Sequence, residues 1–156
     1  MKANGTSGEC GCGQLTYRLS SEPMFVHCCH CKECQKQTGS AYVLNAIIEA
    51  DRLTWVGETT EHTLQTPSGK GQVITRCANC GTAVFSNYLA RLGKLAYIRV
   101  GTLNDPDKYP PDVQIFTSSK QAWVPLNPDI RNFEEFYDFK EVWPEYAYAR
   151  LDAVFG

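Results

Sequence analysis

The chain has 156 residues, of which 15 are basic and 17 acidic, giving a formal net charge of −2. A chain of this length can bury roughly two-thirds of its unfolded surface, and 43% of the residues are hydrophobic. Because the sequence has no basic block, its charge gives no support for binding to nucleic acid or to an acidic membrane surface. We therefore expect one folded domain over residues 1–156.

The chain contains eight cysteines, fewer than a secreted disulfide scaffold of this length would carry. The first twelve residues hold no apolar stretch of the kind found in a signal peptide, and the apolar runs elsewhere are too short to span a bilayer. We expect a cytoplasmic protein, in which closely spaced cysteines indicate metal binding rather than disulfides.

Short segments with strand-like patterns, separated by turn signals, predict a mainly β protein. The first nine residues are small and polar, and we expect them to be flexible. Alternating or β-branched segments predict strands over residues 14–19, 41–48, 53–56, 61–66, 72–76, 82–87, 95–100 and 113–117. Pro67–Gly71 is a strong turn signal between two of them.

The C-terminal tail has a different pattern. Asp129–Tyr137 carries aromatic residues at roughly helical spacing, with Asp129 as a candidate N-cap, and predicts a short helix near the C-terminus. The segment Trp143–Phe155 is rich in aromatic residues and gives no clear prediction.

Two cysteine pairs have the spacing of a closed metal site. Cys10 and Cys12 fall on one face of an extended chain, and Cys77 and Cys80 are followed by Gly81, which can take the positive φ that completes a tight turn. Four thiolates make a tetrahedral site of the structural zinc type, although iron would use the same ligands. Such a site would fasten the N-terminal segment to the middle of the chain.

The stretch from His27 to Cys34 holds four cysteines and two histidines in eight residues, a composition that no hydrophobic core requires. In an extended chain, Cys29 and Cys31 share a face, and Cys34 can return to it through a turn. We take these three cysteines as the ligands of a second, catalytic ion, because three protein ligands leave one coordination position open.

The charge of this second site favours thiol chemistry. A zinc ion with three thiolates carries a net charge near −1, which makes it a poor activator of water compared with a site of three neutral histidines. Such a site is better suited to binding an incoming thiol as thiolate and keeping it nucleophilic near neutral pH.

Three neighbouring residues leave an alternative open. Cys28, His27 or His30 could supply a fourth ligand and close the second site, which would make the protein a non-enzymatic, zinc-stabilised binding module. A redox-sensing thiol cluster without metal is a third alternative.

These residues resemble the glutathione-dependent formaldehyde-activating enzyme family, which is related to the centromere protein V domain and has the Mss4-like fold. The resemblance covers residues from about 8 to about 125 and rests on segments in a fixed order: Cys10-Gly11-Cys12-Gly13 with Tyr17, Cys29-His30-Cys31-Lys32-Glu33-Cys34, Gly39-Ser40, Cys77-Ala78-Asn79-Cys80-Gly81-Thr82, and Val113-Gln114-Ile115-Phe116 with Trp123. Cys28 departs from the expected pattern.

The resemblance implies antiparallel sheets pinned by zinc, with two zinc ions per chain. The structural ion would fall on Cys10, Cys12, Cys77 and Cys80, and the catalytic ion on Cys29, Cys31 and Cys34. It also implies carbon–sulfur lyase-type activity, in which a small thiol, glutathione, adds to a small aldehyde, formaldehyde. Residues that could contact such a substrate are the cations Lys32, Lys36 and Arg76 and the aromatic residues Tyr42, Phe85 and Trp123.

Overall fold

The computed structural model describes residues 5–66 and 69–156, and it confirms the mainly β prediction. Short 3-10 turns join several of the strands. Within the described residues, the helices are α1 (Lys32–Thr38), α2 (Phe139–Val142) and α3 (Glu145–Phe155), and the strands are β1 (Thr6–Glu9), β2 (Thr16–Leu19), β3 (Phe25–Cys29), β4 (Val43–Glu49), β5 (Leu53–Val56), β6 (Thr59–Leu64), β7 (Gln72–Cys77), β8 (Ala83–Tyr88), β9 (Leu95–Arg99), β10 (Val113–Ile115) and β11 (Arg131–Asn132).

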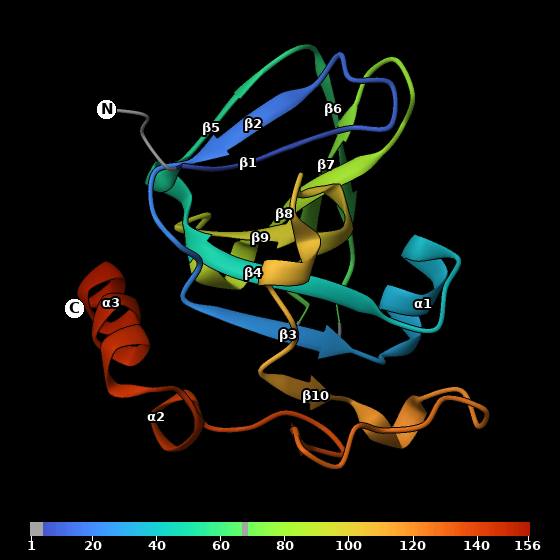
Figure 1. The fold of residues 1–156 in the computed structure, drawn as a ribbon, viewed down its shortest axis with the longest axis vertical. Helices are drawn as coiled ribbons and strands as arrows, with labels where there is room; N and C mark the ends of the chain where they lie inside the picture. Colours follow the sequence, from blue (N-terminus) through green and yellow to red (C-terminus); the bar gives the residue numbers. More distant parts are fainter. Residues whose placement is uncertain (1–4, 67–68) are drawn as a thin grey trace.

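The strands form two sheets, which lie one above the other in Figure 1. The smaller sheet has the order β1-β2-β5, and the larger has the order β11-β10-β3-β4-β9-β8-β7-β6. Most neighbours are antiparallel, as expected from the sequence, but β10 runs parallel to both β3 and β11. A long connection from β9 returns the chain to the opposite side of β3 and makes this parallel pairing feasible.

The large sheet is covered on both faces. On the face towards the small sheet, Val26, Ala46 and Ile98 pack with residues of β2 and β5. On the other face, Phe25 and Ile47 pack with the C-terminal segment. Because neighbouring residues of β3 and β4 alternate between two covered faces, nearly every side chain of these strands is buried, the polar His27 and Asn45 included.

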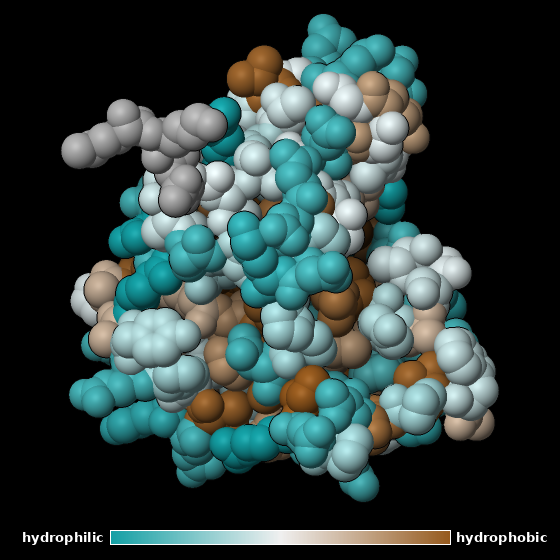
Figure 2. Space-filling model, in the orientation of Figure 1, coloured by the Kyte–Doolittle hydropathy of each residue, from teal (hydrophilic) through white to brown (hydrophobic). Residues whose placement is uncertain are grey.

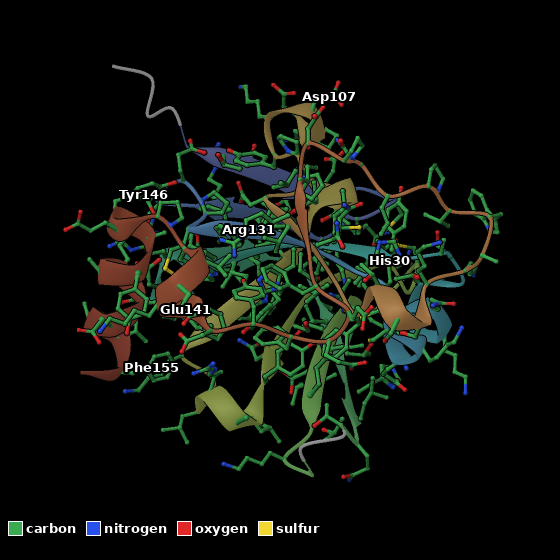
Figure 3. The ribbon with its side chains drawn as sticks, turned by 90° about the horizontal axis from the view of Figure 1, so that it is seen from below. His30, Asp107, Arg131, Glu141, Tyr146 and Phe155 are labelled. Carbon is green, nitrogen blue, oxygen red and sulfur yellow. The ribbon has the colours of Figure 1, made fainter. Side chains whose placement is uncertain are left out.

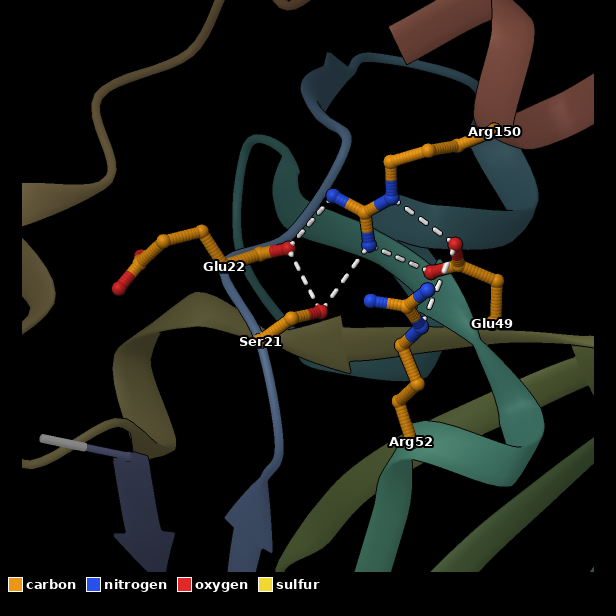
Figure 4. A network of polar contacts seen from close by, with 5 residues as sticks. All are labelled: Ser21, Glu22, Glu49, Arg52 and Arg150. Atoms are coloured by element: carbon orange, nitrogen blue, oxygen red, sulfur yellow. Dashed lines mark hydrogen bonds and ion pairs between the residues drawn. The ribbon is translucent and has the colours of Figure 1, made fainter. Parts of the chain in front are cut away.

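Helix α3 covers one end of the second face and is fixed there by an arginine. Arg150 donates two hydrogen bonds to the carboxylate of Glu49, at 2.9 and 2.6 Å, and reaches the Glu22 carbonyl and the Ser21 hydroxyl at 2.9 and 3.1 Å (Figure 4). Arg52 approaches the same carboxylate at 3.4 Å. The network joins the end of the chain to the turn before β3 and to the end of β4.

The expectation of a short helix near the C-terminus is confirmed by α2 and α3, but its placement over Asp129–Tyr137 is wrong. This segment is extended: β11 pairs with β10, and the Phe133 amide donates to the Gln114 carbonyl at 2.9 Å. The nearest helix, α2, begins later, where the Asp138 side chain accepts a hydrogen bond from the Lys140 amide and acts as the N-cap. The aromatic residues follow the shape of the sheet that they cover, so packing overrides their helical spacing.

The beginning of the chain also differs from expectation. Residues 1–9 were expected to be flexible, but Thr6–Glu9 forms strand β1, which pairs with β2 from Thr6↔Leu19 to Glu9↔Thr16. The structure does not describe residues 1–4. The turn predicted at Pro67–Gly71 also lies partly outside the described residues, at positions 67 and 68.

The surface in Figure 2 is mostly hydrophilic or intermediate, and most of its hydrophobic residues lie in the lower half, below the small sheet. Over residues 5–66 and 69–156, the structure contains no helix with both the length and the apolar character needed to cross a membrane.

Candidate metal centres

Two tight turns bring together the four cysteines that the sequence assigned to a closed site. In the first turn, the Gly13 amide donates to the Cys10 carbonyl at 3.1 Å, and in the second the Gly81 amide donates to the Cys77 carbonyl at 2.9 Å. Both glycines have positive φ, +77° and +76°, which side chains rarely adopt. The two turns belong to segments more than sixty residues apart, as the sequence predicted.

The sulfur atoms of these cysteines fit one tetrahedral ion. The sulfurs of Cys10, Cys12, Cys77 and Cys80 all lie within 4.8 Å of one another. Cys12 Sγ is 3.5 Å from Cys10 Sγ and 3.8 Å from Cys77 Sγ. Four thiolates bound at about 2.3 Å in a tetrahedron lie about 3.8 Å apart, so the observed spacing suits a metal ion.

Hydrogen-bond donors contact three of these sulfurs, those of Cys10, Cys12 and Cys80. The Leu15 amide donates to Cys10 Sγ at 3.3 Å, and the Asn79 side-chain amide donates to Cys12 Sγ at 3.4 Å. The Thr82 hydroxyl lies 3.1 Å from Cys80 Sγ and lowers the pKa of that thiol to about 5. Because metal ligands must be deprotonated, these donors prepare the group for an ion.

The second cysteine group lies where β3 ends and α1 begins. The sulfurs of Cys29, Cys31 and Cys34 lie within 4.8 Å of one another; we call these three residues the cysteine triad. Cys31 is the N-cap of α1, and its sulfur accepts from the Cys34 amide at 3.3 Å. Gly39 ends the helix with φ of +64°. As predicted, a turn returns Cys34 to the other two cysteines; that this turn begins a helix was not predicted from the sequence.

The triad sulfurs interact strongly with one another. Hydrogen bonds from the Cys29 and Cys34 thiols lower the pKa of Cys31. The same contacts raise the pKa of Cys29, and burial raises it further. Cys31 therefore loses its proton first. An ion would have to hold all three sulfurs as thiolates, which only a strongly bound cation can do at neutral pH.

A buried arginine stands beside the triad. Arg99 is 8% exposed, and its guanidinium donates to the Asn45 side-chain oxygen. Burial lowers its pKa, whereas Tyr88, Cys34 and Cys29 act in the opposite direction and favour the charged form. Within the described residues, no Asp or Glu forms an ion pair with it. Thiolates of the triad would therefore help to balance the charge of this buried cation.

The three residues considered as a fourth ligand point elsewhere. His27 Nε2 bonds the Tyr137 hydroxyl, and burial lowers the His27 pKa to about 3. Cys28 Sγ lies 3.5 Å from His30 Nε2, on the opposite face of β3 from Cys29. Figure 3 places His30 at the α1 side of the molecule. In the part of the chain that the structure describes, no other His, Cys, Asp or Glu joins the triad.

The residues suggested as substrate contacts separate into three groups. Arg76 and Tyr42 line a cavity of about 430 Å³ that also contains Arg99. Lys32, Lys36 and Trp123 line a different, shallow hollow on the outer side of α1. Phe85 packs against Trp55 between the two sheets, in the core. Sequence reasoning missed Arg99, although the alternation of β9 puts it on the face opposite Ala96, Ile98 and Val100.

The fold and these sites define a mainly β protein with two cysteine groups, each of which could hold a metal ion. The chain belongs to the glutathione-dependent formaldehyde-activating enzyme family, whose model matches residues 5–119. This match confirms the resemblance seen in the sequence, and all seven clustered cysteines lie within it.

Two further comparisons were made with known proteins. A search of curated proteins found no significant match. A crystal structure of a Rhodobacter sphaeroides protein from a structural genomics programme is similar, with 16% sequence identity and a TM-score of 0.46, over 63% of this chain and 87% of that one.

Proposed function

We propose that this protein is a zinc-dependent, carbon–sulfur lyase-type enzyme that condenses a thiol, glutathione or a similar one, with formaldehyde or another small aldehyde. The observation that carries the proposal is the cysteine triad, a group of three protein ligands that stands apart from the group of four. Family membership supports the same reaction, because the family is named for glutathione-dependent activation of formaldehyde.

The two cysteine groups would have different tasks. Cys10, Cys12, Cys77 and Cys80 would hold a structural ion, since four protein ligands fill a tetrahedral site. A zinc ion on the triad would supply an open coordination position at which an incoming thiol is stabilised as thiolate near neutral pH. We assign two zinc ions per chain on this basis.

The condensation is an addition. The thiol sulfur forms a bond to the aldehyde carbon, the carbon–oxygen double bond becomes a single bond, and the proton released by the thiol ends on that oxygen. The triad carries the negative charge that keeps the site selective for thiols over water activation. Arg99, buried beside Cys34, offsets that charge and keeps the site from becoming too anionic to admit a thiolate.

The non-enzymatic binding module requires a closed second site. Its three candidate ligands have other contacts: His27 with Tyr137, and Cys28 with His30. These contacts favour the enzymatic proposal.

The test is acceleration of the exchange between formaldehyde and glutathione, measured by exchange NMR with and without fully metallated protein. We expect faster exchange with the protein, and loss of that acceleration in Cys34→Ser. A Cys12→Ser variant is unsuitable as a control because it removes a ligand of the other group. Metallated protein that leaves the exchange rate at its uncatalysed value would refute the proposal for these substrates.

Metal analysis gives a second, independent test. We expect two zinc ions per chain, one of which is removed readily by a chelator because it has three protein ligands. One ion per chain in protein purified under reducing conditions would leave the triad without its proposed role.

A further inference from the structure

A cavity of about 430 Å³ lies between α1 and the large sheet. Its walls come from Gln37 and Thr38 of α1, from β4 and β7, and from the turn that follows Cys80. Its volume falls within the range of pockets that hold small ligands. The cavity is therefore large enough for part of a substrate.

Two guanidinium groups share this cavity. Arg76 donates to the Gly81 carbonyl at 3.1 Å and to the Gln37 side-chain oxygen at 3.3 Å, which fixes it between α1 and the turn. Arg99 lies on the same face of the large sheet, in β9, and β8 separates β9 from the strand of Arg76, β7. Burial lowers the pKa of Arg99, and the like charge of Arg76 lowers it further.

Among the residues that the structure describes, neither arginine has a carboxylate partner. Within residues 5–66 and 69–156, the ion pairs involve Arg52, Lys108 and Arg150. Glu33 is linked to Arg76 through Gln37. The Gln37 side chain accepts from Arg76, and its amide donates to the Glu33 carboxylate at 2.9 Å. Two like charges that share a partly buried cavity repel each other, and an anion placed between them would relieve that repulsion.

Three residues that line the cavity, Thr38, Val43 and Arg99, are also neighbours of the cysteine triad. The Thr38 hydroxyl donates to the Cys34 carbonyl at 2.8 Å, and Val43 is the strand partner of Cys29. Arg99 is near enough to Cys34 and Cys29 for their charges to affect it. The three cysteines do not themselves line the cavity, but these neighbours place it next to the triad.

We propose that Arg76 and Arg99 form a carboxylate subsite that selects acidic thiols over neutral ones. The proposal rests on the proposed function, since it assigns the cavity to the thiol substrate. A guanidinium recognises a carboxylate through two parallel hydrogen bonds, which gives orientation as well as affinity. A carboxylate held here fixes the direction in which the thiol approaches the triad.

The test uses ligands that have no free thiol, so that binding does not depend on a metal or on turnover. S-methylglutathione and its diamide, in which both carboxylates are amides, are compared by calorimetric titration of the metallated protein at low salt. We expect S-methylglutathione to bind about tenfold tighter than the diamide, a difference typical of charge-assisted hydrogen bonds. In Arg76→Gln we expect the preference to disappear.

Two further variants keep the test sharp. Arg18→Gln removes an exposed arginine of the small sheet and should leave the preference unchanged, so it controls for a general loss of positive charge. Arg99 is buried, and Arg99→Lys keeps the charge but loses the paired geometry; we expect it to reduce the preference while the circular dichroism spectrum stays that of the wild type.

Failure of this inference is separable from failure of the proposed function. Equal binding of the two ligands, or a preference that survives Arg76→Gln, would overturn the subsite even if the protein accelerates the formaldehyde exchange. An Arg76-dependent preference without acceleration of the exchange would support the subsite and refute the proposed reaction.

Discussion

Cys28 and Cys29 are neighbours in the chain but face opposite sides of the large sheet. Cys29 belongs to the triad, whereas Cys28 packs on the other face, next to His30. The difference follows from the two-residue alternation of strand β3. Identical side chains one position apart should therefore respond differently to substitution.

Replacing these cysteines one at a time tests that difference. We expect Cys34→Ser to lose one metal ion per chain and keep its secondary structure, because the four-cysteine group still pins the sheets. Cys28→Ser, the control, should retain both ions. Metal content by mass spectrometry and circular dichroism check this; loss of an ion from Cys28→Ser would contradict the assignment of the triad.

Gly8 offers a residue-scale test of packing between β1 and the rest of the chain. A Cβ at this position would overlap the Tyr17 hydroxyl and the Thr102 carbonyl. We expect Gly8→Ala to lower the free energy of unfolding by about 1–3 kcal/mol, as other overpacked sites do. Gly101→Ala, where no atom lies within 4 Å of the new Cβ, should change it little. Urea denaturation measures both, and equal effects would contradict the packing argument.

At the scale of elements, the sequence predicted most strands, but it missed helix α1 and placed the C-terminal helix too early in the chain. The strands β4 to β10 overlap the predicted segments because their alternation and β-branched residues are local signals. Helix α1 was missed because its N-cap is a cysteine, Cys31, rather than a residue typical of that position. The pairing of β10 with β3 joins segments far apart in the chain and has no local signal.

In the candidate sites, too, the features with a local signal could be predicted, and those that depend on distant pairing could not. The two cysteine groups could be predicted because spacing restricts which sulfurs can meet. The cavity beside the triad could be predicted only in part: Arg76 was named because it precedes Cys77, whereas Arg99 reaches the site through sheet pairing.

We expect Arg150, which fixes helix α3 to the large sheet, to contribute more to stability than any surface ion pair does. The Glu49 carboxylate is 8% exposed and receives two hydrogen bonds from Arg150. Removing one partner of a buried pair leaves the other charge buried without a partner. We therefore expect Arg150→Gln to lower the free energy of unfolding by about 2–4 kcal/mol. Arg52 contacts the same carboxylate but is 42% exposed, so Arg52→Gln should cost less than about 1 kcal/mol. Equal losses in chemical denaturation would contradict this ranking.

The pair of Glu49 and Arg150 should also make the stability of the protein depend on pH. Burial acts to raise the pKa of Glu49, but hydrogen bonds from Arg150 outweigh it and lower that pKa. At acidic pH the unfolded chain then binds more protons than the folded one, so the contribution of this pair to stability is present above about pH 5 and is lost as the pH falls below about 4. We expect the stability difference between the wild type and Arg150→Gln to shrink between pH 7 and pH 3.5. A difference that stays constant over this range would refute the linkage.

At the scale of the whole molecule, the two cysteine groups connect different parts of the fold. The triad lies within one short stretch of chain, whereas the group of four joins the small sheet to the end of β7. Trp55 of β5 packs on Phe85 of β8 with ring centroids 5.1 Å apart, so its fluorescence reports the contact between the sheets.

Metal removal should therefore occur in two stages. We expect a chelator to release the first ion without a change in the fluorescence of Trp55, and the second with loss of the contact between the sheets, since binding of structural zinc contributes directly to folding. Cys34→Ser, which lacks the first ion, should show only the second stage. Fluorescence that changes with the first ion would contradict this division.

The parallel pairing of β10 with β3 has a consequence for synthesis of the chain on the ribosome. The group of four cysteines is complete once Cys80 has emerged, so the N-terminal half can be pinned early. Strand β3, however, keeps one open edge until Val113–Ile115 is made and occupies it. An unpaired strand edge is a template for pairing with another chain. The nascent protein therefore carries the cysteine triad beside an open strand edge until the chain has emerged as far as Ile115.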